Sequence, residues 1–216
     1  MPRSEFRART FSLAIAALAT ATLATGCSGK PPDDPEAYVQ KLTAGRAAKD
    51  AEFLCSNDPI PTAIHAEFLP LAYFPVDPTY NVIAGLRAAT DDVTLMMPTS
   101  TGQQRKMRQV GTMEFMLKGQ SMSLVAFNEV DAADMNNVTL MFSDMTSGTE
   151  TYAAGRYIDL ERTASGIYSL DFNLAYHPYC YYNPTYECPY PPAGNRLKVP
   201  VHAGERMKKP SEAPTR

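Results

Sequence analysis

Two histidines and two cysteines near the end of the chain have the types and spacing that chemistry requires. His177, Cys180 and Cys188 lie close together, and His202 follows further on. Imidazole and thiolate groups are ligands that Zn²⁺ prefers, so these four residues could form a tetrahedral metal site. The paired C-x2-C knuckles of common zinc sites are absent, however. We therefore expect a disulfide between Cys180 and Cys188, and leave a metal site or two free thiols as alternatives.

A ligand site is the second possibility in the same part of the chain. Arg156 offers a planar fork of donors that suits a small anionic ligand, and nearby tyrosines could stack on sugars or on an aromatic ligand. Arg156 could instead form a structural ion pair with Asp171 or Asp144, because buried charges usually need such partners. The residues expected to converge on one pocket are Arg156, Asp171, Asn173, Tyr176 and Asn195.

Catalysis is a weaker prediction. Asp171, His177 and Cys180 could serve a small hydrolase or a metal-dependent enzyme, but the chain has no G-x-S-x-G elbow and no glycine-rich oxyanion loop. We therefore assign no catalytic residue, expect no cofactor, and leave open whether the protein is an enzyme. A binding module or a structural module is the favoured class.

Most of these residues lie in Asp171–Leu197, which we call the proline–tyrosine loop. It contains six tyrosines and five prolines. Proline lacks an amide donor and fixes φ, so this stretch can be neither a helix nor a central strand. So many aromatic rings would not remain in water, so we predict a long ordered loop that packs on a β-rich body.

The body of the chain has the pattern of short antiparallel strands. Met113–Leu117 and Met122–Phe127 alternate in polarity, and glycine-containing turns separate the segments. The pattern predicts a mainly β fold, either an antiparallel sandwich or a partly open barrel. The predicted strands are Tyr80–Ala88, Asp92–Met97, Arg105–Val110, Thr112–Lys118, Ser121–Phe127, Val138–Phe142, Arg156–Glu161, Ile167–Phe172 and Arg196–His202. The methionines on these strands are interpreted as core residues.

One helix is expected before the strands. Asp34 is a good N-cap and Pro35 a good first helical residue, so we predict a helix from Pro35 to about Leu54. Residues 35–206 are predicted to form a single β-rich domain with this N-terminal helix. Residues 207–216 are predicted to be a polar tail.

The first 34 residues predict export and a lipid anchor. Arg3, Arg7 and Arg9 precede an apolar run that ends at Cys27, and the run is too short to span a membrane comfortably. This arrangement resembles the lipobox of bacterial lipoproteins, which implies a signal peptide at residues 1–26 and a lipidated Cys27. Residues 27–34 would be the tether. In a cell with two membranes, the residue after the cysteine favours the outer membrane, facing the periplasm.

Charge excludes one class of partner. After residue 26 the chain has 22 acidic and 17 basic residues, so its net charge is −5. Binding to nucleic acid is therefore not expected. The expected partners are the membrane, through the lipid on Cys27, and a small anionic or aromatic ligand.

The chain also resembles a family of bacterial and archaeal proteins known as domain of unknown function 1684. The resemblance implies a shared fold and no particular activity. The family pattern does not require a histidine at position 177, which argues against a mechanism that depends on that imidazole. The residues that carry the resemblance are Arg46, Lys49-Asp50, Tyr73–Pro78, Pro98–Gly102, Gly111, Asp144–Gly148, Thr151-Tyr152, Gly155–Tyr157, Asp171–Asn173, Pro178, Cys180, Asn183-Pro184, Cys188-Pro189, Pro191-Pro192 and Asn195.

Overall fold

The computed structural model describes residues 34–55, 58–130 and 136–209. The predicted signal peptide at 1–26 and lipidated Cys27 lie outside the described residues, as does the tether except for Asp34. Of the predicted polar tail, residues 207–209 are described. Within the described ranges, none of the helices combines the length and the hydropathy needed to cross a bilayer.

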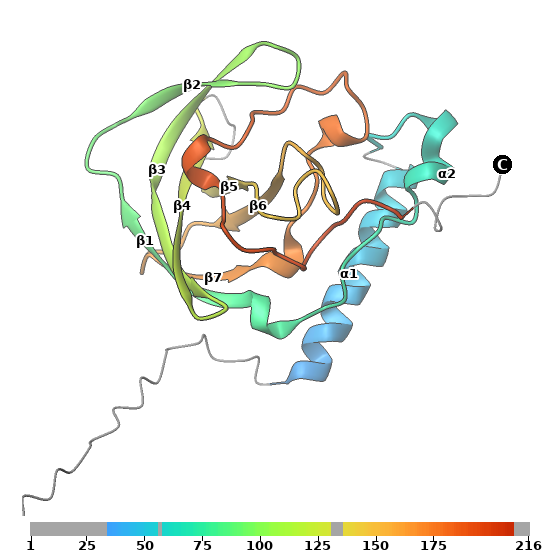
Figure 1. Ribbon diagram of the computed structural model, residues 1–216, viewed down its shortest axis with the longest axis horizontal. Coiled ribbons are helices and arrows are strands. Elements are labelled where there is room, and N and C mark those ends of the chain that lie inside the picture. Colours follow the sequence, from blue (N-terminus) through green and yellow to red (C-terminus); the bar gives the residue numbers. More distant parts are fainter. Residues whose placement is uncertain (1–33, 56–57, 131–135, 210–216) are drawn as a thin grey trace, which may run out of the picture.

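In the described ranges, seven antiparallel strands curl into a nearly closed barrel, which confirms the predicted fold class (Figure 1). The strand order is β6-β5-β4-β3-β1-β7, and β2 pairs with the first half of β3. The strands are β1 Asn81–Ala88, β2 Thr94–Pro98, β3 Gln104–Leu117, β4 Gln120–Glu129, β5 Asn137–Phe142, β6 Arg156–Glu161 and β7 Ile167–Asp171.

The long strand β3 replaces two predicted strands. The sequence suggested a break at Gly111, but the chain continues through a β-bulge between Gln109 and Gly111. A side chain at Gly111 would lie 2.4 Å from the carbonyl oxygen of Arg87 on β1, so this glycine allows close packing of two strands. The bulge lets one half of β3 pair with β2 and the other half with β1.

The barrel interior is apolar, and its residues come from alternate positions of the strands. Met113, Leu124, Leu140 and Ile158 are at most 1% exposed. The predicted strand Arg196–His202 is wrong, although its alternation is real. Leu197, Val199 and Val201 are buried against this interior, but the segment crosses the end of the barrel (Figure 1) and forms a bridge between Ser143 and Arg196.

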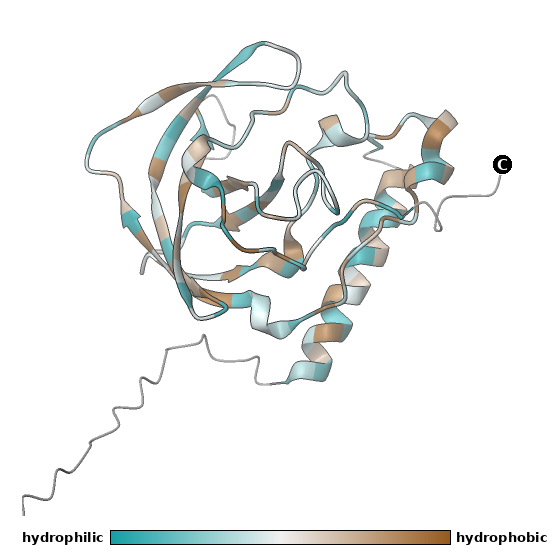
Figure 2. Cartoon of the chain, viewed as in Figure 1, coloured by the Kyte–Doolittle hydropathy of each residue, from teal (hydrophilic) through white to brown (hydrophobic). Residues whose placement is uncertain are grey.

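Helix α1, Pro35–Cys55, lies beside the barrel and begins where the sequence predicts. The Asp34 carboxylate accepts hydrogen bonds from the amides of Glu36 and Ala37, both at 3.0 Å. Two of its residues are buried, Leu42 and Phe53, and Figure 2 shows mostly pale or hydrophilic residues along the rest of it. A short helix α2, His65–Phe68, follows. The 3₁₀ turns are Thr62–Ile64, Pro78–Tyr80, Phe172–Leu174, Tyr179–Tyr181 and Ala193–Asn195.

Polar contacts attach α1 to the rest of the molecule. Lys49 Nζ lies 2.6 Å from Glu205 Oε1, Asp50 accepts from the amide of Leu71 at 2.9 Å, and Arg46 donates to the Phe74 carbonyl at 3.0 Å. Between these contacts, Phe53 packs with Ile60, Leu71 and Tyr182. The orientation of α1 is therefore set by specific hydrogen bonds more than by a broad apolar face.

The proline–tyrosine loop is ordered and packs on the barrel, as predicted. The Tyr157 amide on β6 donates to the Tyr176 carbonyl at 2.9 Å, and the Tyr190 amide donates to Pro98 on β2 at 2.9 Å. At the end of the loop, the amide of Ser143 donates to the carbonyl of Asn195 at 3.0 Å. The loop thus contacts both β2 and β6 and forms one wall of the site.

Candidate functional site

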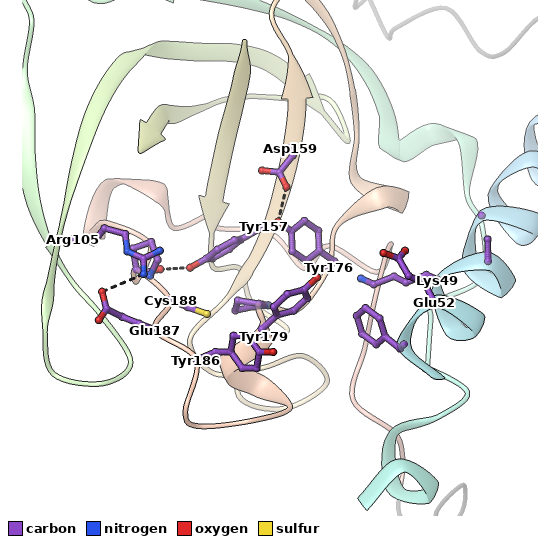
Figure 3. Close-up of a pocket in the computed structure, with 15 residues that line it drawn as sticks. Lys49, Glu52, Arg105, Tyr157, Asp159, Tyr176, Tyr179, Tyr186, Glu187 and Cys188 are labelled. Atoms are coloured by element: carbon purple, nitrogen blue, oxygen red, sulfur yellow. Dashed lines mark hydrogen bonds and ion pairs between the residues drawn. The ribbon is translucent and has the colours of Figure 1, made fainter. Parts of the chain in front are cut away.

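A cleft of about 800 Å³ lies between α1 and the proline–tyrosine loop. Figure 3 shows Lys49 and Glu52 on the helix facing the tyrosines of the loop, with Arg105 and Glu187 at the opposite end. Strands β3 and β6 supply the remaining wall. The lining residues are Gly45, Ala48, Lys49, Glu52, Phe53, Arg105, Tyr157, Asp159, Tyr176, Pro178, Tyr179 and Tyr186–Pro189.

One face of α1 forms the helical wall. Gly45, Ala48, Lys49 and Glu52 are spaced by three or four residues, so they share that face. The first two residues are small. A Cβ atom added to Gly45 would have no other atom within 4 Å. The glycine that weakens the helical pattern in the sequence thus leaves open space at the cleft.

Tyrosine rings form the opposite wall, and hydrogen bonds hold several of them in place. The Tyr176 hydroxyl donates to Asp159 Oδ2 at 2.6 Å, and the Tyr157 hydroxyl donates to the Pro189 carbonyl. The rings of Tyr179 and Tyr186 pack edge to face, with centroids 5.2 Å apart. Burial raises the pKa of both Tyr157 and Tyr176. Their hydroxyls therefore remain protonated at neutral pH.

The charges on the walls nearly balance. Lys49 pairs with buried Glu205 and also lies over the Tyr176 ring, 4.8 Å from its centroid. Arg105 pairs with Glu187 through Nη2 at 3.3 Å and with Glu129 through Nε at 3.3 Å. The lining contains two cations, Lys49 and Arg105, and three carboxylates, Glu52, Asp159 and Glu187. This balance favours a ligand with little net charge.

Two cysteines lie together beside the cleft. Cys188 lines it, and the backbone amide of Cys180 donates to Cys188 Sγ at 3.3 Å. Both are free thiols in the structure, so the predicted disulfide stays a prediction. Hydrogen bonding from the Cys188 thiol lowers the pKa of Cys180 to about 6. The same hydrogen bond, with burial, raises the pKa of Cys188.

Arg156, a predicted ligand residue, lies inside the protein. It forms a structural ion pair, which was the alternative interpretation from the sequence. It is 0% exposed, and its Nη2 lies 2.9 Å from Asp144 Oδ2. The guanidinium also donates to the carbonyls of Val201 at 2.8 Å, Glu205 at 3.1 Å and Ala203. Burial lowers the pKa of Arg156. The residue holds the crossing segment 201–205 against β6.

The other four predicted residues are divided among different places. Asp171 accepts from Tyr38 at 2.8 Å and from the amide of Asn173 at 2.9 Å. Asn173 and Tyr176 line another cavity of about 370 Å³, which Lys49 also lines, and Tyr176 also lines the main cleft. Asn195 is 0% exposed. The structure thus does not gather the five residues in one pocket, and ligand binding by them stays a prediction.

The two histidines of the alternative zinc site have partners other than the two cysteines. His177 Nε2 accepts from the amide of Tyr152 at 3.2 Å. His202 Nε2 lies 3.0 Å from Glu150 in an exposed pair. Within the described ranges, no group of three or more His, Cys, Asp or Glu side chains could hold a metal ion. The enzyme alternative depended on three residues, and each of them has a different hydrogen-bond partner: Asp171, His177 and Cys180.

Sequence reasoning missed most of the cleft. Lys49, Arg105 and Asp159 lie on a helix and two strands that are far apart in the chain, and nothing in their spacing relates them. Lys49 did appear among the residues of the family resemblance. Two predicted site residues line the main cleft: Tyr176, predicted to bind a ligand, and Cys188, predicted to form a disulfide or, alternatively, to bind zinc.

Comparisons with known proteins agree with the resemblance. Residues 66–206 match the family described as protein of unknown function, DUF1684. The uncharacterized protein from gene locus rrnAC0354 of Haloarcula marismortui, solved by solution NMR, is 36% identical with a TM-score of 0.63, over 79% of this chain and 95% of that one. Among curated proteins, none matches this chain. The chain therefore belongs to the DUF1684 family.

Proposed function

We propose that this protein is a lipid-anchored extracytoplasmic binding protein, and that its ligand is a small uncharged molecule whose ring has apolar faces and several hydroxyl groups at its rim, as in a sugar. The observation that carries the proposal is the cleft between α1 and the proline–tyrosine loop, with its tyrosine wall and balanced charges. The anchor is inferred from the lipobox at Cys27. In a cell with two membranes, the protein would be on the outer membrane, facing the periplasm.

The ligand class follows from the two kinds of group in the cleft. Tyrosine rings present flat apolar faces together with polar edges, which suits a ring that is apolar on its faces and polar at its rim. Asp159 and Glu187 supply acceptors, while Lys49 and Arg105 supply donors. A strongly anionic ligand would meet one carboxylate more than there are cations, so the cleft favours a neutral one.

The hydrogen bonds of the cleft walls also support binding. Tyr176 is held by Asp159 and Tyr157 by Pro189, so these rings lose little freedom when a ligand packs on them. A site of about 800 Å³ lies within the usual range for small-molecule pockets.

Two tyrosines of equal exposure allow a controlled test. Tyr186 lines the cleft and is 37% exposed, whereas Tyr190 is 36% exposed and lies outside the lining. The probes are cellobiose, maltose and diacetylchitobiose, measured by saturation-transfer NMR. We expect a signal from at least one sugar, its loss in Tyr186→Ala, and its retention in Tyr190→Ala.

Because both rings are substantially exposed, either variant should fold, and circular dichroism with thermal unfolding checks this. The proposal fails if none of the sugars gives a signal with the wild type. It also fails if Tyr186→Ala binds as well as Tyr190→Ala.

A further inference from the structure

Sulfur-containing residues gather in one buried cluster next to the cleft. The cluster has seven buried residues, each at most 8% exposed, and five of them contain sulfur. They come from β2, β3, β5 and the proline–tyrosine loop, so they are distant in the sequence. The five are Met97, Met107, Met141, Cys180 and Cys188.

Backbone hydrogen bonds of both cysteines hold the two thiols side by side. Cys188 is attached to the turn between β2 and β3, because its amide donates to Ser100 Oγ at 3.1 Å and its carbonyl accepts from the Ser100 amide at 3.0 Å. Cys180 lies in the 3₁₀ turn Tyr179–Tyr181, and its amide donates to Cys188 Sγ at 3.3 Å. Their proximity therefore does not depend on a covalent bond between them.

The chemistry of this cluster selects a particular class of ion. Thiolate and thioether sulfur are soft ligands that prefer Cu(I), whereas Mg²⁺ and Ca²⁺ require oxygen ligands. A structural zinc site needs four ligands, usually cysteine and histidine. Within the described part of the chain, no third cysteine, histidine or carboxylate completes such a group around the two thiols.

We propose that Cys180 and Cys188 bind one soft monovalent metal ion, Cu(I) or its analogue Ag(I), through their two thiolates, with a thioether from the neighbouring methionines. Each thiol releases its proton to solvent when the ion binds, and the ion keeps its oxidation state. Cys188 lines the cleft, so the ion can reach the sulfur atoms from there. The site adjoins the proposed sugar site through Cys188, but the metal proposal does not rest on sugar binding.

The test uses the full-length protein, solubilised in detergent, reduced and kept without oxygen. Cu(I) is supplied from its complex with the chelator bicinchoninate, whose absorbance reports the copper removed. We expect the protein to take one equivalent. Cys180→Ser and Cys188→Ser should each weaken the affinity by more than about 100-fold, since loss of an outer partner alone costs 10–100-fold.

Cys55 provides the matched control, because it is the remaining cysteine of the described residues and is exposed. Cys55→Ser should bind copper like the wild type, and at least one of Met97→Leu, Met107→Leu and Met141→Leu should weaken binding. Cys180 does not line the cleft, so retention of sugar binding by Cys180→Ser would separate this site from the proposed function.

Three results would overturn the proposal. The first is failure of the reduced wild type to take copper from the chelator, which would leave the pair as a structural disulfide or as inert thiols. The second is unchanged copper binding in Cys180→Ser and Cys188→Ser. The third is tighter binding of Zn²⁺ than of Cu(I), measured by competition.

Discussion

His177 is a buried residue whose neutral form the fold requires. It is 1% exposed, and its Nε2 accepts a hydrogen bond from the Tyr152 amide. Its own backbone amide donates to Glu205 Oε2 at 2.7 Å. Burial lowers the pKa of His177 well below the ordinary value, and the positive charges of Arg156 and Lys49 lower it further. The imidazole is therefore an uncharged acceptor at neutral pH.

Because the pKa of His177 is lowered in the folded protein, we expect the protein to lose stability in mild acid. The unfolded chain protonates His177 near its ordinary pKa of about 6.5, while the folded chain does not. The unfolded state thus binds more protons below that pH, and the free energy of unfolding falls as pH decreases. Between pH 7.5 and 5.5 the contribution is at most about 1.4 kcal/mol. Urea unfolding at the two pH values measures it.

Two variants isolate this contribution. His177→Gln should be less stable than the wild type at pH 7.5, but should lose less stability on acidification. His202 lies in an exposed pair with Glu150, so in His202→Gln the free energy of unfolding should depend on pH as it does in the wild type. An equal pH dependence in His177→Gln and the wild type would contradict this role.

At the scale of elements, the segment 201–205 joins α1, the barrel and the proline–tyrosine loop. Its carbonyls accept from Arg156 on β6, and its Glu205 side chain accepts from Lys49 on α1 and from Tyr182 in the loop at 2.8 Å. The segment can reach these partners because Gly204 adopts a positive φ of 76° and lies close to the loop backbone. A side chain there would lie 2.4 Å from the Ala175 carbonyl oxygen.

Gly204→Ala should therefore be strongly destabilising. Gly102 is a matched control, because its φ is 81° and its missing side chain would have no atom within 4 Å. We expect Gly102→Ala to cost about 1 kcal/mol for the left-handed backbone alone. Gly204→Ala should cost about 2 kcal/mol more, because the added carbon forces backbone apart. Chemical denaturation compares the two, and equal losses would refute the close-packing explanation.

At the scale of the whole molecule, the predicted lipid on Cys27 would place the cleft near a membrane. Several acyl chains anchor a protein stably, whereas one chain is marginal. In a bacterial host, Cys27→Ser should abolish incorporation of labelled palmitate and move the protein to the soluble fraction. Cys55→Ser should remain labelled and membrane-bound. Labelling that survives Cys27→Ser, or a soluble wild type, would show that this anchor does not exist.

Much of the fold was predictable because the signals are local. Asp34 and Pro35 mark the start of α1, and β6 has the predicted bounds, Arg156–Glu161. The alternating polarity of residues 196–202 also reflects their burial, but their backbone hydrogen bonds do not form a β-ladder with a neighbouring strand. The Met145 amide donates to Val199 at 3.3 Å, and the Val201 carbonyl accepts from Arg156. The polarity pattern alone does not reveal which groups form hydrogen bonds with the backbone of a segment.

Asn195 shows why a binding site is harder to predict from a sequence than a fold class. Its amide donates to the carbonyls of Val125 on β4 and Met141 on β5, both at 2.8 Å, and its Oδ1 accepts from the Val125 amide at 2.8 Å. The side chain therefore joins two strands instead of facing a ligand. In sequence, an asparagine that completes a sheet and one that binds a substrate look alike.

The sequence by itself determined the mainly β class, the start of α1, the ordered proline–tyrosine loop and the membership of the DUF1684 family. The first three properties depend on hydrophobic periodicity, capping and turn chemistry, which act over a few neighbouring residues, whereas the family was identified from a resemblance in particular residues. Only the tertiary structure decided that α1, β3, β6 and the loop enclose a cleft, and that three methionines meet two cysteines. The reason is physical: such sites form where faces of distant elements pack together, and a loop with five prolines has no periodicity that says which face it covers.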